Sequence, residues 1–358
     1  MTMRLEGHAM ENIINSVNAA IWSNWLVFLC LGAGVYFSCV TLFLQVRCFP
    51  DMIRQLKSGE DSAAGISSFQ SLMISLAGRV GVGNIGGVAT AIAFGGPGAV
   101  FWMWIVAFLG SATSYVECCL AQIYKEKDQD TGEYRGGPAY YIEKAYRHTA
   151  ARPFALVYAI VFAVSMILAT SYFLPGVQAN GLATSVEHAW SVPTWVTAVA
   201  MVVLLGIIVI GGVKRIAWFA SMVVPFMAVI YILVAIVVLF ANASQIPEVF
   251  GLILRSAFDK EAAFSGMLGF AIMWGVKRGI YSNEAGQGTG PQSAAAAEVS
   301  HPAKQGFVQS FAVYVDTLLV CSATAFIIIS TDMFRVHSGG DEDLSLIHIS
   351  EPTRRTPI

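Results

Sequence analysis

The chain has 358 residues, of which 56% are hydrophobic and 12% are charged, and its formal net charge is −2. Soluble domains carry about 25% charged residues, so this sequence holds more apolar side chains than one water-soluble core can bury. The few charges lie between apolar runs and form no basic surface, which excludes nucleic-acid binding as a function.

Apolar runs of about 20 residues, the length that crosses a bilayer as a helix, recur along the chain. They predict an all-α polytopic membrane protein with about eight spans. The expected spans cover residues 21–46, 66–94, 98–124, 154–174, 194–211, 216–240, 262–276 and 306–330. Residues 1–20 then form an extracytoplasmic segment, and residues 21–343 form one membrane domain.

The positions of Lys and Arg predict the orientation of these spans. Basic residues gather in the loops that follow the first, third, fifth and seventh spans. The intervening loops at 95–97 and 175–193 contain neither Lys nor Arg. Because basic short loops stay in the cytoplasm, we expect the N-terminus outside and residues 125–152 in the cytoplasm, as an interfacial helix or a solvated loop.

The second expected span contains an unusually weak segment. Glycines occupy positions 78, 81, 83, 86 and 87, with Asn84 among them. The glycines could simply let neighbouring helices approach closely. Alternatively, the helix unwinds near residues 81–83 and offers carbonyls to a cation and amides to an anion. Arg79 favours the second interpretation, because a charge at this depth costs about 2.5 to 3.5 kcal/mol and usually serves a pathway or an ion pair.

Residues 264–290 form a second glycine-interrupted apolar stretch, five spans after the first. Transporters built from inverted repeats place their broken helices at corresponding positions of the two halves. This spacing predicts a binding site shared by the second and seventh spans. Three acids also fall in or near spans: Glu117 and Glu284 are expected to be structural, whereas Asp316 lies near mid-span and could be structural or functional.

No HExxH or GxSxG motif and no plausible Ser, His and acid combination is present, so an enzyme is not expected. Seven strings, in order between about residues 12 and 334, resemble the alanine or glycine:cation symporter family. They are GRVGVGNIGGVATAI at 78, GGPGAVFWMWIVAFLG at 95, GGPAYYIE at 136, VQAN at 177, GGVKRIA at 211, VPFMAVIYI at 224 and MWGVKRGIYSNEAG at 273.

The resemblance implies the leucine-transporter type of inverted-repeat fold, with one extra N-terminal helix. It implies import of alanine, glycine or a similar small neutral amino acid with Na⁺, or with H⁺, by a monomer in the bacterial inner membrane. No cofactor is expected beyond Na⁺ as the coupling ion. A membrane receptor or accessory subunit that keeps the amino-acid pocket without transport is the alternative.

The resemblance also implies roles for particular residues, with helix packing as the alternative for each. The expected substrate-binding residues are Gly81, Val82, Gly83, Asn84, Gln178, Phe270, Met273 and Trp274. The expected cation-binding residues are Ala77, Val80 and Asn84. Arg79 stands where many carriers of this fold have a small residue. Its guanidinium is expected either to replace a cation that touches the substrate or to pair with Asp316.

The second repeat is expected to be incomplete, because family members continue through about three more spans after residue 330. Residues 344–358, LSLIHISEPTRRTPI, are unlike any family segment and resemble the translation of a sequencing adapter. We therefore expect that tail to be non-native and the chain to be an inactive fragment of the complete carrier.

Overall fold

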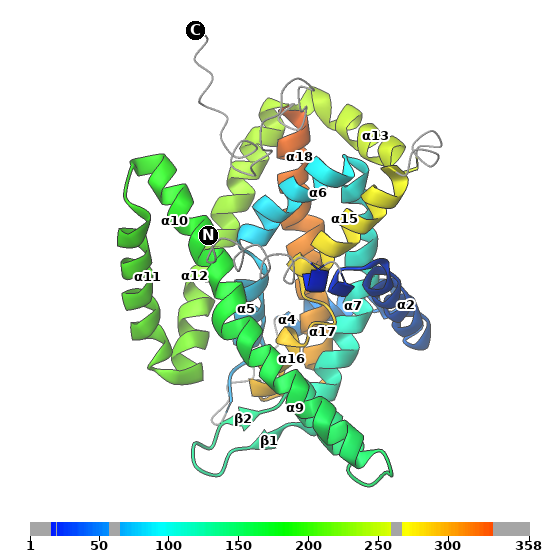
Figure 1. Cartoon of the computed structure of the whole chain (residues 1–358), viewed down its shortest axis with the longest axis vertical. Coiled ribbons are helices and arrows are strands. Elements are labelled where there is room, and N and C mark those ends of the chain that lie inside the picture. Colours follow the sequence, from blue (N-terminus) through cyan, green and yellow to red (C-terminus); the bar gives the residue numbers. More distant parts are fainter. Residues whose placement is uncertain (1–15, 19, 57–64, 259–266, 332–358) are drawn as a thin grey trace, which may run out of the picture.

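The structure is a computed structural model that describes residues 16–18, 20–56, 65–258 and 267–331. Most of the predicted extracytoplasmic segment, the first residues of the predicted seventh span and the predicted tail at 344–358 lie outside these ranges. Every predicted span contains a helix, so the chain is an all-α, multi-pass membrane protein, and the described residues include one small β-hairpin (Figure 1).

Four helices of the described residues are long and apolar enough to cross a membrane. They are α7 (Gly98–Tyr124), the continuous helix Arg152–Trp190, α12 (Gly212–Ala241) and the continuous helix Pro302–Ser330. A fifth span is formed by α5 (Ser68–Arg79) and the helix Gly83–Gly95, which meet at an angle of 54°.

Three of the eight predicted spans therefore fall short of this length in the described residues. Helix α2 (Asn24–Val40) has 17 residues, α11 (Thr194–Val209) has 16, and α15 (Met267–Asn283) has 17. In the first of them, Leu42 and Phe43 adopt φ values of 54° and 51°, so a left-handed turn interrupts the apolar run. Hydropathy counted these turn residues as part of the span.

Two predicted loops are wrong because helices continue through them. Helix α9 (Arg152–Leu168) passes through the π-helix η2 (Ala169–Phe173) into α10 (Leu174–Trp190), although residues 175–193 were expected to be a loop. The wide π-turn immediately before Pro175 changes the hydrogen-bonding register where the proline lacks a donor. Figure 1 shows the result as one long diagonal helix.

Helix α15 likewise runs past Lys277 and Arg278, which were expected to follow the seventh span in a cytoplasmic loop. The Arg278 guanidinium lies 5.5 Å from the Trp274 ring centre and 6.0 Å from that of Tyr281. These cation–π contacts retain the charge inside the helix.

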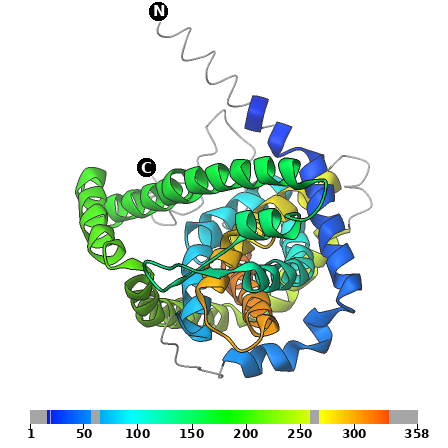
Figure 2. The ribbon, with the colours of Figure 1, turned by 90° about the horizontal axis from the view of Figure 1, so that it is seen from below.

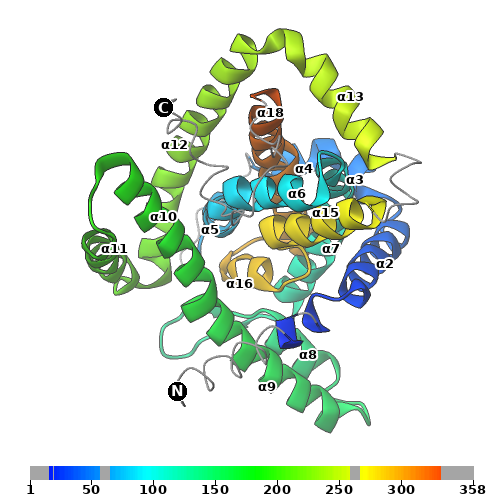
Figure 3. The same cartoon turned by 45° about the horizontal axis from the view of Figure 1, so that its top comes forward.

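The most deeply buried part of the fold is built around α7. This helix packs against both α15 and α17 (Pro302–Val313) (Figure 1), and Figure 3 shows α15 next to α7. After α17 come the π-helix η4 (Tyr314–Cys321) and α18 (Ser322–Ser330). In the most apolar segment of the helix Pro302–Ser330, 61% of the residues are buried. In the corresponding segment of α12 the share is 11%. The broken span lies within this core, and α9 to α12 lie at its periphery.

Shorter elements complete the chain. In Figure 2 the N-terminal helices follow the outer edge of the core. The short elements are α3 (Leu44–Arg47), α4 (Phe49–Leu56), α6 (Val88–Gly95), β1 (Glu126–Lys127), β2 (Tyr134–Arg135), α8 (Pro138–Ala145), η3 (Ala243–Gln245), α13 (Ile246–Ala257) and α16 (Thr289–Ala296).

The segment 125–152 thus contains both a hairpin and a short helix. From the sequence we expected either an interfacial helix or a solvated loop. Strands β1 and β2 pair antiparallel, with Glu126 opposite Arg135. Glu126 forms ion pairs with Lys144, at 2.9 Å, and with Arg135, at 3.0 Å. These two partners hold the pKa of the Glu126 carboxyl below its usual value, the hydrogen bond from Lys144 having the larger effect.

The start of α7 provides a test of this packing. A Cβ at Gly98 would lie 2.6 Å from backbone atoms of Ser256 and Ala257, which cannot move without displacing α13. Gly98→Ala is therefore expected to destabilise the protein by about 1 to 3 kcal/mol, the usual cost of overpacking. Thermal unfolding in detergent measures this change.

Gly206→Ala in α11 is the matched control, because nothing lies within 4 Å of a Cβ built there. Equal unfolding temperatures for the two variants would contradict the packing of α7 against α13.

Candidate functional site

The predicted break in the second span is confirmed, and it has two parts. Helix α5 ends at Arg79, and Val80 takes an extended conformation with φ −82° and ψ 106°. The chain then enters the π-helix η1 (Gly83–Gly87) before it continues as α6. The backbone between the two helical halves therefore lacks regular helical hydrogen bonding in a region that must satisfy its polar groups without water.

Side-chain amides bind the backbone amides of the break. The N–H of Gly81 donates to Asn84 Oδ1 at 2.8 Å, and the N–H of Val82 donates to Gln178 Oε1 at 2.9 Å. A Cβ at Gly81 would lie 2.7 Å from Gln178 Oε1, so glycine allows this close approach. The structure thus brings together four predicted site residues, namely Gly81, Val82, Asn84 and Gln178. Each of the two backbone amides already donates to its own side-chain oxygen.

Asn84 also connects the break to a buried carboxylate. Its Nδ2 donates to Asp316 Oδ1 at 2.6 Å. The other carboxylate oxygen, Oδ2, accepts hydrogen bonds from Ser282 Oγ at 2.8 Å and Thr317 Oγ1 at 2.7 Å. All four side chains are at most 1% exposed. Ser282 and Thr317 were not identified from the sequence, although Ser282 lies within the SNEAG string that carries the family resemblance.

Arg79 does not form the direct ion pair with Asp316 that was one of its two expected roles. Its Nη1 donates to the Gln309 carbonyl at 3.3 Å and its Nη2 to Ser114 Oγ at 3.5 Å. In the part of the chain that the structure describes, no Arg79 nitrogen lies within 4 Å of an acidic oxygen. The side chain turns toward α7 and α17, whereas neutral donors surround Asp316. The other expected role of Arg79 stays a prediction.

A cavity of about 440 Å³ lies beside the break. Its walls include predicted site residues from the second span and from α10, namely Ala77, Val80, Gly83 and Gln178. Arg79 and Glu284 add one cation and one acid to the lining, and Tyr281 closes a side. The Nε of Arg79 is buried and has no hydrogen-bond partner in the described ranges. This cavity is therefore the candidate site.

The residues predicted on the seventh span lie elsewhere. Phe270 is 52% exposed, Met273 packs in an apolar cluster with Val27, and Trp274 stacks on Phe94 at 4.8 Å between ring centres. None of the three lines the cavity. Because α15 continues to Asn283, the part of this helix that faces the break is its last turns, with Tyr281 and Ser282. The predicted pocket segment, residues 270–275, therefore lies about two helical turns before the residues of α15 that face the break.

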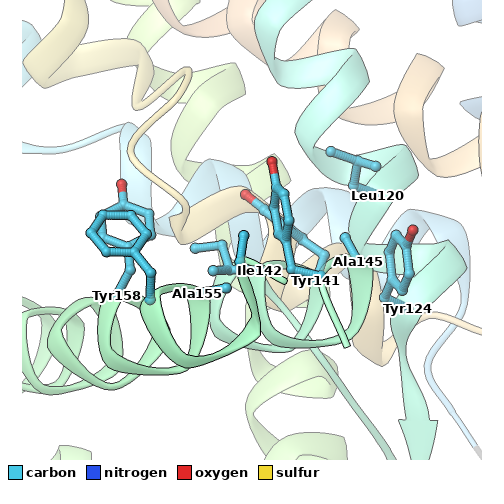
Figure 4. Close-up of a pocket in the computed structure, with 10 residues that line it drawn as sticks. Leu120, Tyr124, Tyr141, Ile142, Ala145, Ala155 and Tyr158 are labelled. Atoms are coloured by element: carbon cyan, nitrogen blue, oxygen red, sulfur yellow. The ribbon is translucent and has the colours of Figure 1, made fainter. Parts of the chain in front are cut away.

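A second cavity, of about 620 Å³, lies between the end of α7, α8 and the start of α9 (Figure 4). Tyrosine hydroxyls are its main polar groups, from Tyr124, Tyr141, Tyr146 and Tyr158. Its lining has no charged side chain, so it offers nothing to hold the charged ends of an amino acid.

Comparisons with known proteins identify the family that the chain resembles. The sodium:alanine symporter family matches residues 7–350. A Bacillus subtilis protein provisionally named a sodium/proton-dependent alanine carrier is 55% identical over 92% of this chain and 66% of its own length. The sodium/proton-dependent alanine carrier protein of Bacillus sp. strain PS3 is 49% identical, over 80% of this chain and 62% of its own length.

The sodium/alanine symporter AgcS of Methanococcus maripaludis is 39% identical, over 88% of this chain and 70% of its own length. The chain therefore spans about two thirds of the length of the curated relatives it matches.

Asn84 allows a test of the site's architecture that does not depend on function. Asn84→Ala would leave the Gly81 N–H and Asp316 Oδ1 without their present partner in a buried region. We expect a loss of about 1 to 3 kcal/mol of stability, the cost of an unsatisfied buried polar group. Thermal unfolding in detergent is the measurement, with Asn180→Ala, an exposed position on α10, as the control. An Asn84 variant as stable as the control would contradict the described bonding.

Proposed function

The chain belongs to the sodium:alanine symporter family, and we propose that it is a secondary active symporter for alanine, glycine or a similar small neutral amino acid. The coupling ion is Na⁺ or H⁺, and the protein lies in a bacterial inner membrane with its N-terminus outside. The names of relatives at 49% and 55% identity, both alanine carriers dependent on sodium or protons, support this proposal. Because the chain spans only part of those relatives, the activity is inferred for the complete carrier.

The fold we propose is the leucine-transporter type, with two inverted repeats of five helices and α2 as an extra N-terminal helix. Its support is the position of α15, the helix formed by the second glycine-interrupted stretch. Helix α15 contacts η1 directly and lies five predicted spans after it. In such carriers corresponding broken helices of the two halves meet at the substrate.

The observation that carries the functional proposal is the pair of amides at Gly81 and Val82. Each donates to a side-chain carbonyl oxygen, and a substrate carboxylate would replace those oxygens with a charged acceptor. The amides stand at the start of η1, where the helix dipole favours a negative group. In the absence of substrate, the side-chain oxygens of Asn84 and Gln178 thus accept the hydrogen bonds that we propose for the carboxylate.

The cation is proposed to use the opposite side of the break. Carbonyls of Ala77 and Val80 belong to the C-terminal end of α5, which carries partial negative charge. Arg79 adds a fixed positive charge in the cavity wall. We propose that its guanidinium serves in place of a cation that touches the substrate carboxylate.

Uptake of radiolabelled alanine by proteoliposomes tests the function. With an inward Na⁺ gradient the complete carrier is expected to accumulate alanine above the external concentration, and an ionophore that collapses the gradient should abolish accumulation. Binding of alanine without accumulation would instead identify a receptor or accessory subunit. Absence of both binding and uptake would refute the amino-acid site.

Arg79 is expected to be required for transport. Arg79→Gln removes the charge from the cavity while it keeps much of the side chain, and we expect alanine uptake to fall by at least about tenfold. Membrane insertion, checked by fluorescence-detected gel filtration, should be normal. Arg54→Gln is the control, because Arg54 is exposed and pairs only with Asp51 among the described residues. Unchanged uptake and Na⁺ dependence in Arg79→Gln would refute this role.

A further inference from the structure

The cavity between α7, α8 and α9 takes no part in the proposed transport. Its volume of about 620 Å³ lies within the range of cavities that hold small ligands, about 300 to 1,000 Å³. Each of the three helices supplies one tyrosine, namely Tyr124, Tyr141 and Tyr158, as Figure 4 shows. The other lining side chains are apolar, apart from Tyr146. The cavity therefore suits a molecule that has an apolar chain and a polar end.

The position of the cavity places it at the boundary between membrane and water. It lies where the membrane-spanning α7 ends and where the membrane-spanning helix Arg152–Trp190 begins. Tyrosine is enriched at this boundary, because its ring is apolar and its hydroxyl is polar. A ligand here would therefore have its chain at the depth of the lipid tails and its polar end at the depth of the headgroups.

One side of the cavity is open. Ala155 is buried in its wall, whereas Phe154 and Tyr158 are 77% and 54% exposed. The exposed side chains that follow on α9, such as Val157 and Val161, are apolar and suit contact with the membrane. The molecules that reach the opening from this side are therefore membrane lipids.

The headgroup must decide which lipid binds. An acyl chain gains little from the cavity, because the surrounding lipid is as apolar as the cavity wall. Residues 143–152, from the end of α8 to the start of α9, contain three basic residues and one acid, Glu143. This local excess of positive charge favours an anionic headgroup over a neutral one.

Two arginines stand next to the cavity wall in sequence. Arg147 directly follows the lining residue Tyr146, and Arg152 directly follows the lining residue Ala151. Both arginines are exposed, and neither forms an ion pair with another residue that the structure describes. The third basic residue, Lys144, is already paired with Glu126. Guanidinium groups bind phosphate oxygens with two parallel hydrogen bonds, so Arg147 and Arg152 are suited to a phosphate.

We propose that an anionic phospholipid binds at this cavity, with one acyl chain between α7, α8 and α9 and its phosphate at Arg147 and Arg152. The proposal uses the orientation given above, in which residues 125–152 face the cytoplasm, where basic pockets between membrane helices bind anionic headgroups. It does not depend on the symport function. The lipid joins α8 to α9, and its binding therefore stabilises the folded protein.

Lipid titration of the complete carrier tests the site. The carrier is delipidated in detergent, and native mass spectrometry then measures the dissociation constants of phosphatidylglycerol and phosphatidylcholine. Phosphatidylglycerol is expected to bind at least about tenfold more tightly. The double variant Arg147→Gln/Arg152→Gln should lose that preference, whereas its affinity for phosphatidylcholine should stay the same.

Arg47→Gln/Arg54→Gln is the charge-matched control. Arg47 and Arg54 are also exposed and lie in the first expected cytoplasmic loop, and neither lines the cavity. This control should keep the preference for phosphatidylglycerol. An equal loss of preference in the two double variants would show unspecific attraction to the whole surface and would refute the site. Equal affinities of the unmodified protein for the two lipids would refute it as well.

A second pair of variants tests the acyl chain separately. Ala151→Trp places a large ring at an exposed position of the cavity wall, and Ala150→Trp places the same ring one residue outside the lining. We expect Ala151→Trp to weaken phosphatidylglycerol binding by at least about fivefold and Ala150→Trp to leave it unchanged. Equal affinities in these two variants would contradict a chain in the cavity. Alanine takes no part in these measurements, so failure of the lipid site leaves the proposed symport standing.

Discussion

The structure depends on one constraint: backbone amides inside a membrane need acceptors, and the break leaves the amides of Gly81 and Val82 without helical partners. Asn84 and Gln178 supply the acceptors for Gly81 and Val82. Because these side chains can leave when a better acceptor arrives, the same bonds that stabilise the broken helix define a site for an anionic group. Stability and binding therefore use the same atoms.

The rest of the core positions those atoms. Helix α7 packs against both α15 and α17, and α15 and η4, which follows α17, bring Ser282 and Asp316 to Asn84. Buried polar networks are costly when partly satisfied, and this one is surrounded by well-packed apolar clusters. Arg79 lies on the cavity side of the same region but bonds to α7 and α17. Arg79 and Asp316 therefore lie in the same region but bond to different partners.

The break could be predicted from the sequence because closely spaced glycines and Asn84 weaken a helix locally, within a few residues. The long helices α7 and α12 could be predicted for a similar reason, since each is one uninterrupted apolar run. The seventh span was misplaced because hydropathy ended it at Val276, whereas cation–π contacts allow Arg278 to remain inside α15. The partners of Asp316 could not be predicted, because Asn84 lies 232 residues away in sequence and only tertiary packing brings them together.

Hydrogen–deuterium exchange over residues 80–84 tests the central claim most directly, that the amides of the break bind the substrate carboxylate. Alanine added together with Na⁺ should slow exchange in this segment more than either does alone, while an outer segment such as residues 202–206 of α11 stays unchanged. Saturable alanine binding with no change in exchange at residues 80–84 would contradict the claim and place the substrate elsewhere.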